Sequence, residues 1–219
     1  MGADEEPGKH PDLALEDEAP DLSQSPSPEL LADVPVRSGA PPLLRRVEGR
    51  FFRSVLATRL GKILDPPDPH SAGRYHRPGE RILYTSATFE SAVAAISGYM
   101  RQDGLPRMMV PLRIGEVFVL DQHDEEICKV FGIERDRSNE SWQAAIAEGH
   151  EPASWRNADI ARAAGAGGII DRSRKMPGAW HLNLFYWNES GGPSVEICGE
   201  PVEILASADG PTWDRSRTD

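Results

Sequence analysis

Basic side chains gather at turns in two parts of the chain, where they could bind an anionic ligand. The first turn, residues 73–79, carries Arg74 and leads into an apolar run that ends at Tyr84. The second, residues 171–175, surrounds Ser173 with arginine and lysine. A guanidinium group presents paired N–H donors that match phosphate oxygens, so both turns are candidate phosphate sites. The alternative is that both are ordinary solvated loops.

Other side chains capable of chemistry have weaker support from their surroundings. Arg53 follows two phenylalanines in a run that predicts a strand, where it either reaches solvent along its aliphatic stem or holds an anion. His76 and His181 could each serve as a base, although a single histidine in a loop or strand is more often structural. Cys128 and Cys198 are too few for a disulfide framework, and the six histidines lack the spacing of a zinc site. We therefore expect no metal.

The elements that position these side chains predict an α+β domain. Residues 82–84 form a short strand, and Thr88 caps a helix whose apolar residues recur at helical spacing as far as Met100. Further strands are predicted at 51–55, 108–120 (two strands, or one with a bulge), 169–170, 181–187, 195–197 and 202–205, and helices at 121–130, 141–148 and 155–164. Pro111 indicates an edge strand, and Gly199 a hairpin between the last two strands. We expect a twisted, mainly antiparallel sheet with several short helices.

Charge and proline content divide the chain into tails and one folded domain. Residues 1–42 hold ten acidic residues against two basic ones, eight of the 19 prolines and no aromatic residue. Such a segment buries too little apolar surface to offset the entropy of ordering it, so we expect a disordered acidic tail. Residues 43–206 then form the domain, and residues 207–219 are expected to be a disordered C-terminal tail.

Composition also argues against several classes of partner and location. The folded part, residues 43–219, holds 25 acidic and 22 basic residues, and with the acidic tail this argues against direct binding to nucleic acid. No apolar run reaches the length that spans a membrane. The N-terminus lacks the basic and then apolar pattern of a secretory signal. We therefore expect a cytoplasmic protein without a membrane segment.

Three short blocks carry a resemblance to a known family. An aromatic–arginine pair stands at residues 52–53, a Gly-Arg-Tyr turn at residues 73–75 before the strand 82–84, and a glycine-rich turn leads to a serine at residues 167–173. In this order the blocks resemble the RES domain, the toxin fold of bacterial RES–Xre toxin–antitoxin pairs. The resemblance extends from about Phe51 to about Leu205, most of the expected domain.

The resemblance implies an ADP-ribosyltransferase-like fold and a function. RES toxins bind nicotinamide adenine dinucleotide (NAD) as a substrate, cleave it or transfer its ADP-ribose, and are neutralised by an Xre-type antitoxin protein. Carried over by position, Arg53 and Arg74 would hold the phosphates of NAD. Tyr84 would stack on the nicotinamide or its ribose, and Ser173 would hydrogen-bond the amide or the ribose. Tyr84 and Ser173 are then the candidate catalytic residues.

The chain departs from the family pattern at one acidic position. The family places a glutamate eleven residues past the tyrosine, and counting from Tyr84 gives Ala95. Glu90 lies on the same predicted helix but about 140° away around it. Two functions remain: an active toxin that consumes NAD, and a RES-fold module that binds a nucleotide or protein without turnover. A carboxylate reaching the site from Glu80, Glu90 or Asp171 favours the enzyme, and an apolar site favours the binding module.

Overall fold

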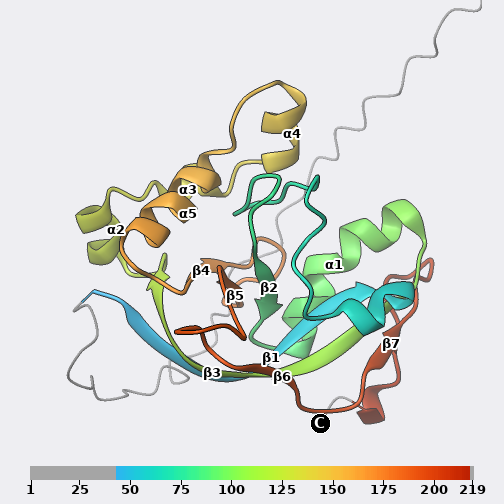
Figure 1. Ribbon diagram of the computed structural model, residues 1–219. Coiled ribbons are helices and arrows are strands. Elements are labelled where there is room, and N and C mark those ends of the chain that lie inside the picture. The colour runs from blue at the N-terminus through green and yellow to red at the C-terminus, as the bar shows by residue number, and fades with distance from the viewer. Residues whose placement is uncertain (1–42, 218–219) are drawn as a thin grey trace, which may run out of the picture. The chain divides into compact units, whose positions relative to one another are not determined.

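Residues 43–217 are described in the computed structural model of this protein, with only the backbone at position 137 (Figure 1). The predicted tail at residues 1–42 lies outside the described residues. The strands are β1 Arg45–Leu56, β2 Leu83–Ser86, β3 Arg107–Asp121, β4 Gly168–Arg172, β5 Trp180–Leu184, β6 Val195–Ile197 and β7 Val202–Ile204. They form one sheet in the order β1-β2-β5-β4-β3-β6, with β7 also paired to β3. Because β1 pairs with β3 as well, β1, β2, β5, β4 and β3 form a closed ring of hydrogen-bonded neighbours.

The sheet is mainly antiparallel, as predicted, and β3–β4 is its parallel pair. The region 108–120 is a single strand with a bulge, because the β1–β3 register shifts between Val47 and Gly49. Between the pairs Val47–Val117 and Gly49–Ile114, one residue of β1 lies opposite two residues of β3. The extra residue of the bulge is therefore in β3, near Gly115.

The helices flank the sheet on two sides (Figure 1). They are α1 Phe89–Asp103, α2 Glu125–Phe131, α3 Arg135–Ser138, α4 Trp142–Ala147 and α5 Ala153–Ala163, with 3-10 turns at Ala57–Lys62 and Arg215–Arg217. Figure 1 shows α1 on one side of β2 and the group α2, α3 and α5 on the other. Thr88 caps α1 as predicted: its hydroxyl accepts from Ser91 N at 3.1 Å, and Gly104 ends the helix with a φ of 65°.

Two predicted details of the sheet are wrong, and both concern β3. Pro111 indicated an edge strand, but β3 pairs with β1 on one side and with β6 and β7 on the other. Cys198 N donates to Pro111 O at 3.0 Å, so the proline nitrogen also faces this side, in the gap between β6 and β7, and no ladder bond is lost. The predicted hairpin of β6 with β7 does not form, because each strand pairs with β3 instead.

The C-terminal segment, where the sequence predicts a disordered tail, makes defined contacts as far as it is described. Leu205 and Thr212 exchange two backbone hydrogen bonds of 2.9 Å. The Trp213 ring packs on Phe89 of α1, with ring centroids 5.4 Å apart. The packing of this partly buried ring on the apolar cluster offsets part of the entropy of ordering the segment.

Alternation along the strands separates the main core from the face that carries the functional site. Phe51, Leu83 and Leu182 point into the largest apolar cluster. Their neighbours Phe52 and Tyr84 point to the opposite face of the sheet, because successive side chains of a strand alternate between its two faces. The face of the sheet on which a side chain lies therefore decides which of the predicted site residues can line the same pocket.

Replacing Gly168 with alanine is expected to destabilise the domain by about 1–3 kcal/mol. A Cβ at Gly168 would lie 2.6 Å from the carbonyl oxygen of Asn183 and 3.2 Å from Leu184 Cα, so the β4–β5 pair would have to shift. Gly61→Ala is the matched control, since a Cβ there meets no atom within 4 Å. Urea denaturation of the two variants measures the difference, and equal midpoints would contradict the close approach.

Candidate functional site

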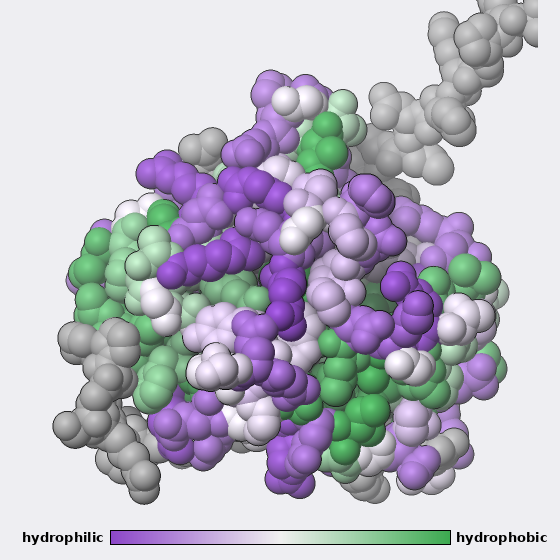
Figure 2. All heavy atoms as spheres, viewed as in Figure 1, coloured by the Kyte–Doolittle hydropathy of each residue, from purple (hydrophilic) through white to green (hydrophobic). Residues whose placement is uncertain are grey.

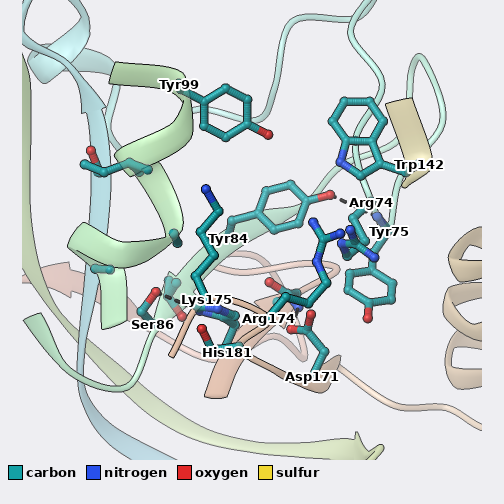
Figure 3. Close-up of a pocket in the computed structure, with 18 of the residues that line it drawn as sticks. Arg74, Tyr75, Tyr84, Ser86, Tyr99, Trp142, Asp171, Arg174, Lys175 and His181 are labelled. Atoms are coloured by element: carbon teal, nitrogen blue, oxygen red, sulfur yellow. Dashed lines mark hydrogen bonds between the residues drawn. The ribbon is translucent and has the colours of Figure 1, made fainter. Parts of the chain in front are cut away.

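A pocket of about 460 Å³ opens between α1, the polar face of the sheet and the loops around α4. This volume lies within the range of roughly 300–1,000 Å³ that is common for ligand sites. Its floor comes from β2, β5 and β4, and one wall comes from the face of α1 that carries Ala95 and Tyr99. The connecting loops and the start of α4 complete it with Arg74, Trp142, Arg174 and Lys175 (Figure 3). Ser173 also lines it.

The floor is a row of polar residues built by strand register. Ser86, His181 and Asp171 lie directly opposite one another across β2, β5 and β4. Ser86 Oγ and His181 Nδ1 share a hydrogen bond of 2.9 Å (Figure 3). Asn183, two residues along β5 on the same face, donates from Nδ2 to Asp171 Oδ1 at 2.9 Å. Three neighbouring strands therefore hold hydroxyl, imidazole and carboxylate groups side by side.

The charges on this floor follow from burial and from neighbouring groups. Burial raises the pKa of Asp171 above its ordinary value, opposed by His181 and by the hydrogen bond from Asn183. Burial lowers the pKa of His181, and the nearby Arg74 and Arg174 add to this, against the pull of Asp171. The imidazole is therefore neutral at neutral pH.

Tyr84 is fixed at the centre of the pocket by its hydroxyl. That oxygen accepts from Tyr75 N at 3.0 Å and lies 2.9 Å from Nδ1 of His76. Burial raises the pKa of Tyr84 and lowers the pKa of His76 to about 4, so both side chains are neutral. Gly73 permits this arrangement, because a Cβ there would lie 2.4 Å from the His76 ring and 2.7 Å from the Tyr84 hydroxyl.

Cationic side chains surround the pocket and hold the loop before α4 in place. Arg74 donates from its NH1 atom to the carbonyls of Ser138 and Glu140, and Arg174 donates to the carbonyl of Asn139 at 3.3 Å. The second terminal nitrogen of Arg74 is buried without a hydrogen-bond partner in the described chain. A buried donor of this kind is costly to leave unmade, and an anionic ligand in the pocket would satisfy it.

Two aromatic side chains stand on opposite sides of the pocket mouth (Figure 3). Tyr99 projects from α1 and is 44% exposed, and Trp142 is the first residue of α4. Their ring faces suit stacking on a planar heterocycle. Sequence reasoning missed both residues. Helical spacing from Ala95 to Tyr99 could have indicated the first, whereas nothing in the sequence ties Trp142 to this site.

The structure brings three of the four predicted site residues together. Arg74, Tyr84 and Ser173 line the pocket. Arg53 does not, because its side chain leaves β1 on the face opposite to Phe52 and donates to the carbonyl of Tyr84 at 3.3 Å. Burial lowers the pKa of Arg53 to about 10, and its hydrogen bond to Tyr84 O links β1 to β2. Arg53 therefore lies outside the residues that line the pocket.

Ser173 lies at the pocket wall and also closes a turn. Its side-chain oxygen accepts from Met176 N at 3.2 Å, and its backbone N donates to Ala179 O at 2.9 Å. The residue is 9% exposed. The hydroxyl hydrogen remains free to point to a ligand, because the bond from Met176 N uses Oγ as an acceptor.

One of the three acidic side chains considered for the site reaches it. Asp171 is the sole carboxylate that lines the pocket among the described residues, and Ala95 lines the same pocket. Glu80 instead accepts from the backbone N of Arg77 at 2.6 Å, and Glu90 is exposed in the first turn of α1. The pocket is thus neither apolar nor without an acid.

Comparison with known proteins places this fold in one family. The RES domain family matches residues 43–204, and the chain belongs to that family. Among solved structures, it is similar to the toxin of the M. tuberculosis MbcT–MbcA toxin–antitoxin complex, with a TM-score of 0.51 and 11% identity. The match covers 74% of this chain and 87% of that chain, and it confirms the predicted α+β fold as a RES toxin fold. No curated protein matches the sequence.

A second hollow, of about 320 Å³, lies between β7 and the C-terminal segment and is lined by residues within 202–205 and 212–214. Figure 2 shows a largely hydrophilic face on which hydrophobic residues gather in separate areas. In residues 43–217, no helix is long and apolar enough to cross a membrane. His, Cys, Asp and Glu side chains of the same residues do not form groups of three that could hold a metal ion.

Proposed function

We propose that this protein is a RES toxin that binds NAD in the pocket and breaks its N-glycosidic bond, either cleaving NAD or transferring its ADP-ribose. The observation that carries the proposal is the position of Asp171, a carboxylate inside a pocket with cationic and aromatic walls. Membership of the RES family supports the same reading. A module that only binds would need the cations and the aromatic rings, but not the acid.

The walls suit the parts of NAD that do not react. The unpaired guanidinium nitrogen of Arg74 is a donor for the pyrophosphate, and Arg174 lies beside it. Tyr99 and Trp142 offer ring faces for a base at the mouth. Tyr84 lies deeper, where it can stack on the nicotinamide or its ribose, and Ser173 can donate to the amide or the ribose.

The floor of the pocket offers a carboxylate for cleavage of the N-glycosidic bond. When the N-glycosidic bond cleaves, its electron pair moves to the pyridinium nitrogen, and positive charge develops on the ribose. A carboxylate beside the ribose stabilises that charge in the transition state. Asp171 supplies it from β4, in place of the glutamate that the family carries at the position of Ala95. This arrangement favours the enzyme over the binding module.

The proposal includes a protein partner and a location. The M. tuberculosis structure is that of a toxin–antitoxin complex, and this chain shares the toxin fold. We therefore expect an antitoxin partner, of the Xre type that the RES family implies. A protein that consumes NAD acts where NAD is present, which fits a cytoplasmic location.

Arg74→Ala is expected to weaken NAD binding about ten- to a hundredfold, since it removes charge-assisted hydrogen bonds to the pyrophosphate. Isothermal titration calorimetry measures the affinity, and chromatography of nicotinamide measures the reaction. Arg101→Ala is the control, because Arg101 is exposed in the last turn of α1 and does not line the pocket.

Nicotinamide release and NAD binding by the wild-type protein distinguish the two functions. Nicotinamide release that Arg74→Ala suppresses and Arg101→Ala leaves intact would support the enzyme. Binding of NAD without release would instead establish the binding module. Absence of NAD binding by the folded wild-type protein would overturn the proposal as a whole.

A further inference from the structure

His181 is a pocket residue to which the proposed function assigns no role. Its Nδ1 is held by Ser86 Oγ at 2.9 Å, and Asp171 lies directly opposite on the neighbouring strand. No described residue forms a hydrogen bond with its Nε2, and the side chain lines the pocket. A histidine that is oriented on one nitrogen and open on the other has the arrangement of a general base.

Breaking the N-glycosidic bond leaves one proton to be placed. When the acceptor is a hydroxyl group, its oxygen bonds to the ribose carbon as nicotinamide departs with the glycosidic electron pair. The hydroxyl proton must then leave the oxygen. We infer that His181 Nε2 takes this proton, which makes His181 the general base for a hydroxyl acceptor, water in the simplest case. The inference rests on the proposed function.

Ser86 acts as the positioning residue for this base. The open nitrogen carries a lone pair when Nδ1–H donates to Ser86 Oγ, and this tautomer directs the lone pair of Nε2 away from Ser86. Ser86 is itself fixed, because it ends β2 and pairs with both β1 and β5. The ring is therefore held by a rigid strand and not by a mobile loop.

The charged groups that face His181 keep its imidazole neutral before the proton transfer. From β4, Asp171 stabilises the imidazolium that forms after proton transfer. From the loops, Arg74 and Arg174 oppose that charge, and together with burial they keep the pKa below its ordinary value. His181 therefore enters the reaction as the neutral base at neutral pH, and protonation in acid removes its activity.

The acceptor class follows from the same chemistry. A base is useful only when the acceptor carries its proton at neutral pH, as water and the hydroxyl groups of alcohols and side chains do. An acceptor that is already an anion needs no such group. We therefore assign the acceptor to groups that carry a proton at neutral pH, of which water and hydroxyl groups are the simplest.

His181→Asn tests the base without removing its support, because the asparagine amide can still hydrogen-bond Ser86 while no titratable nitrogen remains. We expect kcat to fall by about a hundredfold or more, with the Kd for NAD from calorimetry unchanged. Added imidazole should restore part of the rate. His70→Asn is the control, since His70 is exposed in a loop outside the pocket.

Ser86 variants separate positioning from folding. Ser86→Ala is expected to lower kcat and to shift the acidic limb of its pH profile, whereas Ser86→Thr keeps the hydroxyl and the wild-type profile. Thermal melting of each variant confirms that it is folded.

The outcomes distinguish this inference from the proposed function. Release of nicotinamide that His181→Asn leaves at the wild-type rate overturns the general base and keeps the NAD enzyme. A loss of rate that imidazole cannot rescue, together with weaker NAD binding, also overturns it, because His181 would then be a binding residue. A wild-type protein that does not consume NAD overturns both.

Discussion

Asp171→Asn is expected to lower nicotinamide release by about a hundredfold or more, with little change in the Kd for NAD. The carboxylate is useful only when positive charge develops on the ribose, so its loss affects the transition state more than the bound substrate. Asparagine keeps the size of the side chain and an oxygen that can accept from Asn183 Nδ2. Measured kcat and Kd for the wild type and the variant test the expectation.

The stability of this variant provides an independent reading. Burial raises the folded-state pKa of Asp171 above the unfolded value, so the ionised carboxylate opposes folding. The stability that the protonated side chain contributes, relative to the ionised one, is fully present below the unfolded pKa and is lost as the pH rises through the folded pKa. Asp171→Asn should therefore melt at the same temperature as the wild type or at a higher one at pH 7. At acidic pH, the melting temperature of the wild type should rise relative to that of the variant.

Glu90→Gln is the matched control for the loss of an acid. Glu90 is exposed in the first turn of α1 and does not line the pocket, so its replacement should leave nicotinamide release unchanged. If Asp171→Asn melts no lower than the wild type and still releases nicotinamide at the wild-type rate, the proposed role of Asp171 is wrong. A residue kept at a cost to stability but with a large effect on rate is the pattern expected of an active site.

The local pattern of the sequence predicted the elements well. Thr88 and the apolar spacing up to Met100 depend on neighbours within a few residues, and α1 begins and ends close to where they indicate. The pairing of β6 and β7 depends on which distant strand offers a free edge. Gly199 predicted a hairpin, but β3 is long enough to pair with both strands at once. Local signals could not reveal that competition.

The candidate site was predictable in part for the same reason. Arg74 and Tyr84 share one short segment, and the turn at Gly73 brings them to the same pocket. Arg53 has similar chemistry, but its position within β1 places it on the other face of the sheet. The polar row of the floor needs two registers, that of β2–β5, which joins residues about a hundred positions apart, and that of β4–β5, which places Asp171 opposite His181. No spacing in the sequence encodes those registers.

Ala95→Glu is expected to rescue Asp171→Asn. Ala95 lines the pocket from α1 and is half-buried, so a glutamate there can extend into the same space without full loss of hydration. In the Asp171→Asn background it would return one carboxylate to the pocket, and we expect it to recover nicotinamide release by about tenfold or more. In the wild-type background, the added glutamate would face Asp171, and like charges in one site raise a carboxyl pKa and weaken both groups. We expect no gain there.

The four proteins form a double-mutant cycle in which the sign of the coupling is the result that matters. A gain from Ala95→Glu with Asp171 absent, and none with Asp171 present, shows that one carboxylate is needed and that either wall can supply it. Ala95→Gln is the control, because it adds the same bulk without the charge. Equal effects of Ala95→Glu in both backgrounds, with NAD binding intact, would show that position 95 does not reach the ribose. The carboxylate of this RES protein would then belong to β4 alone, and the acid of the site could not be restored from α1.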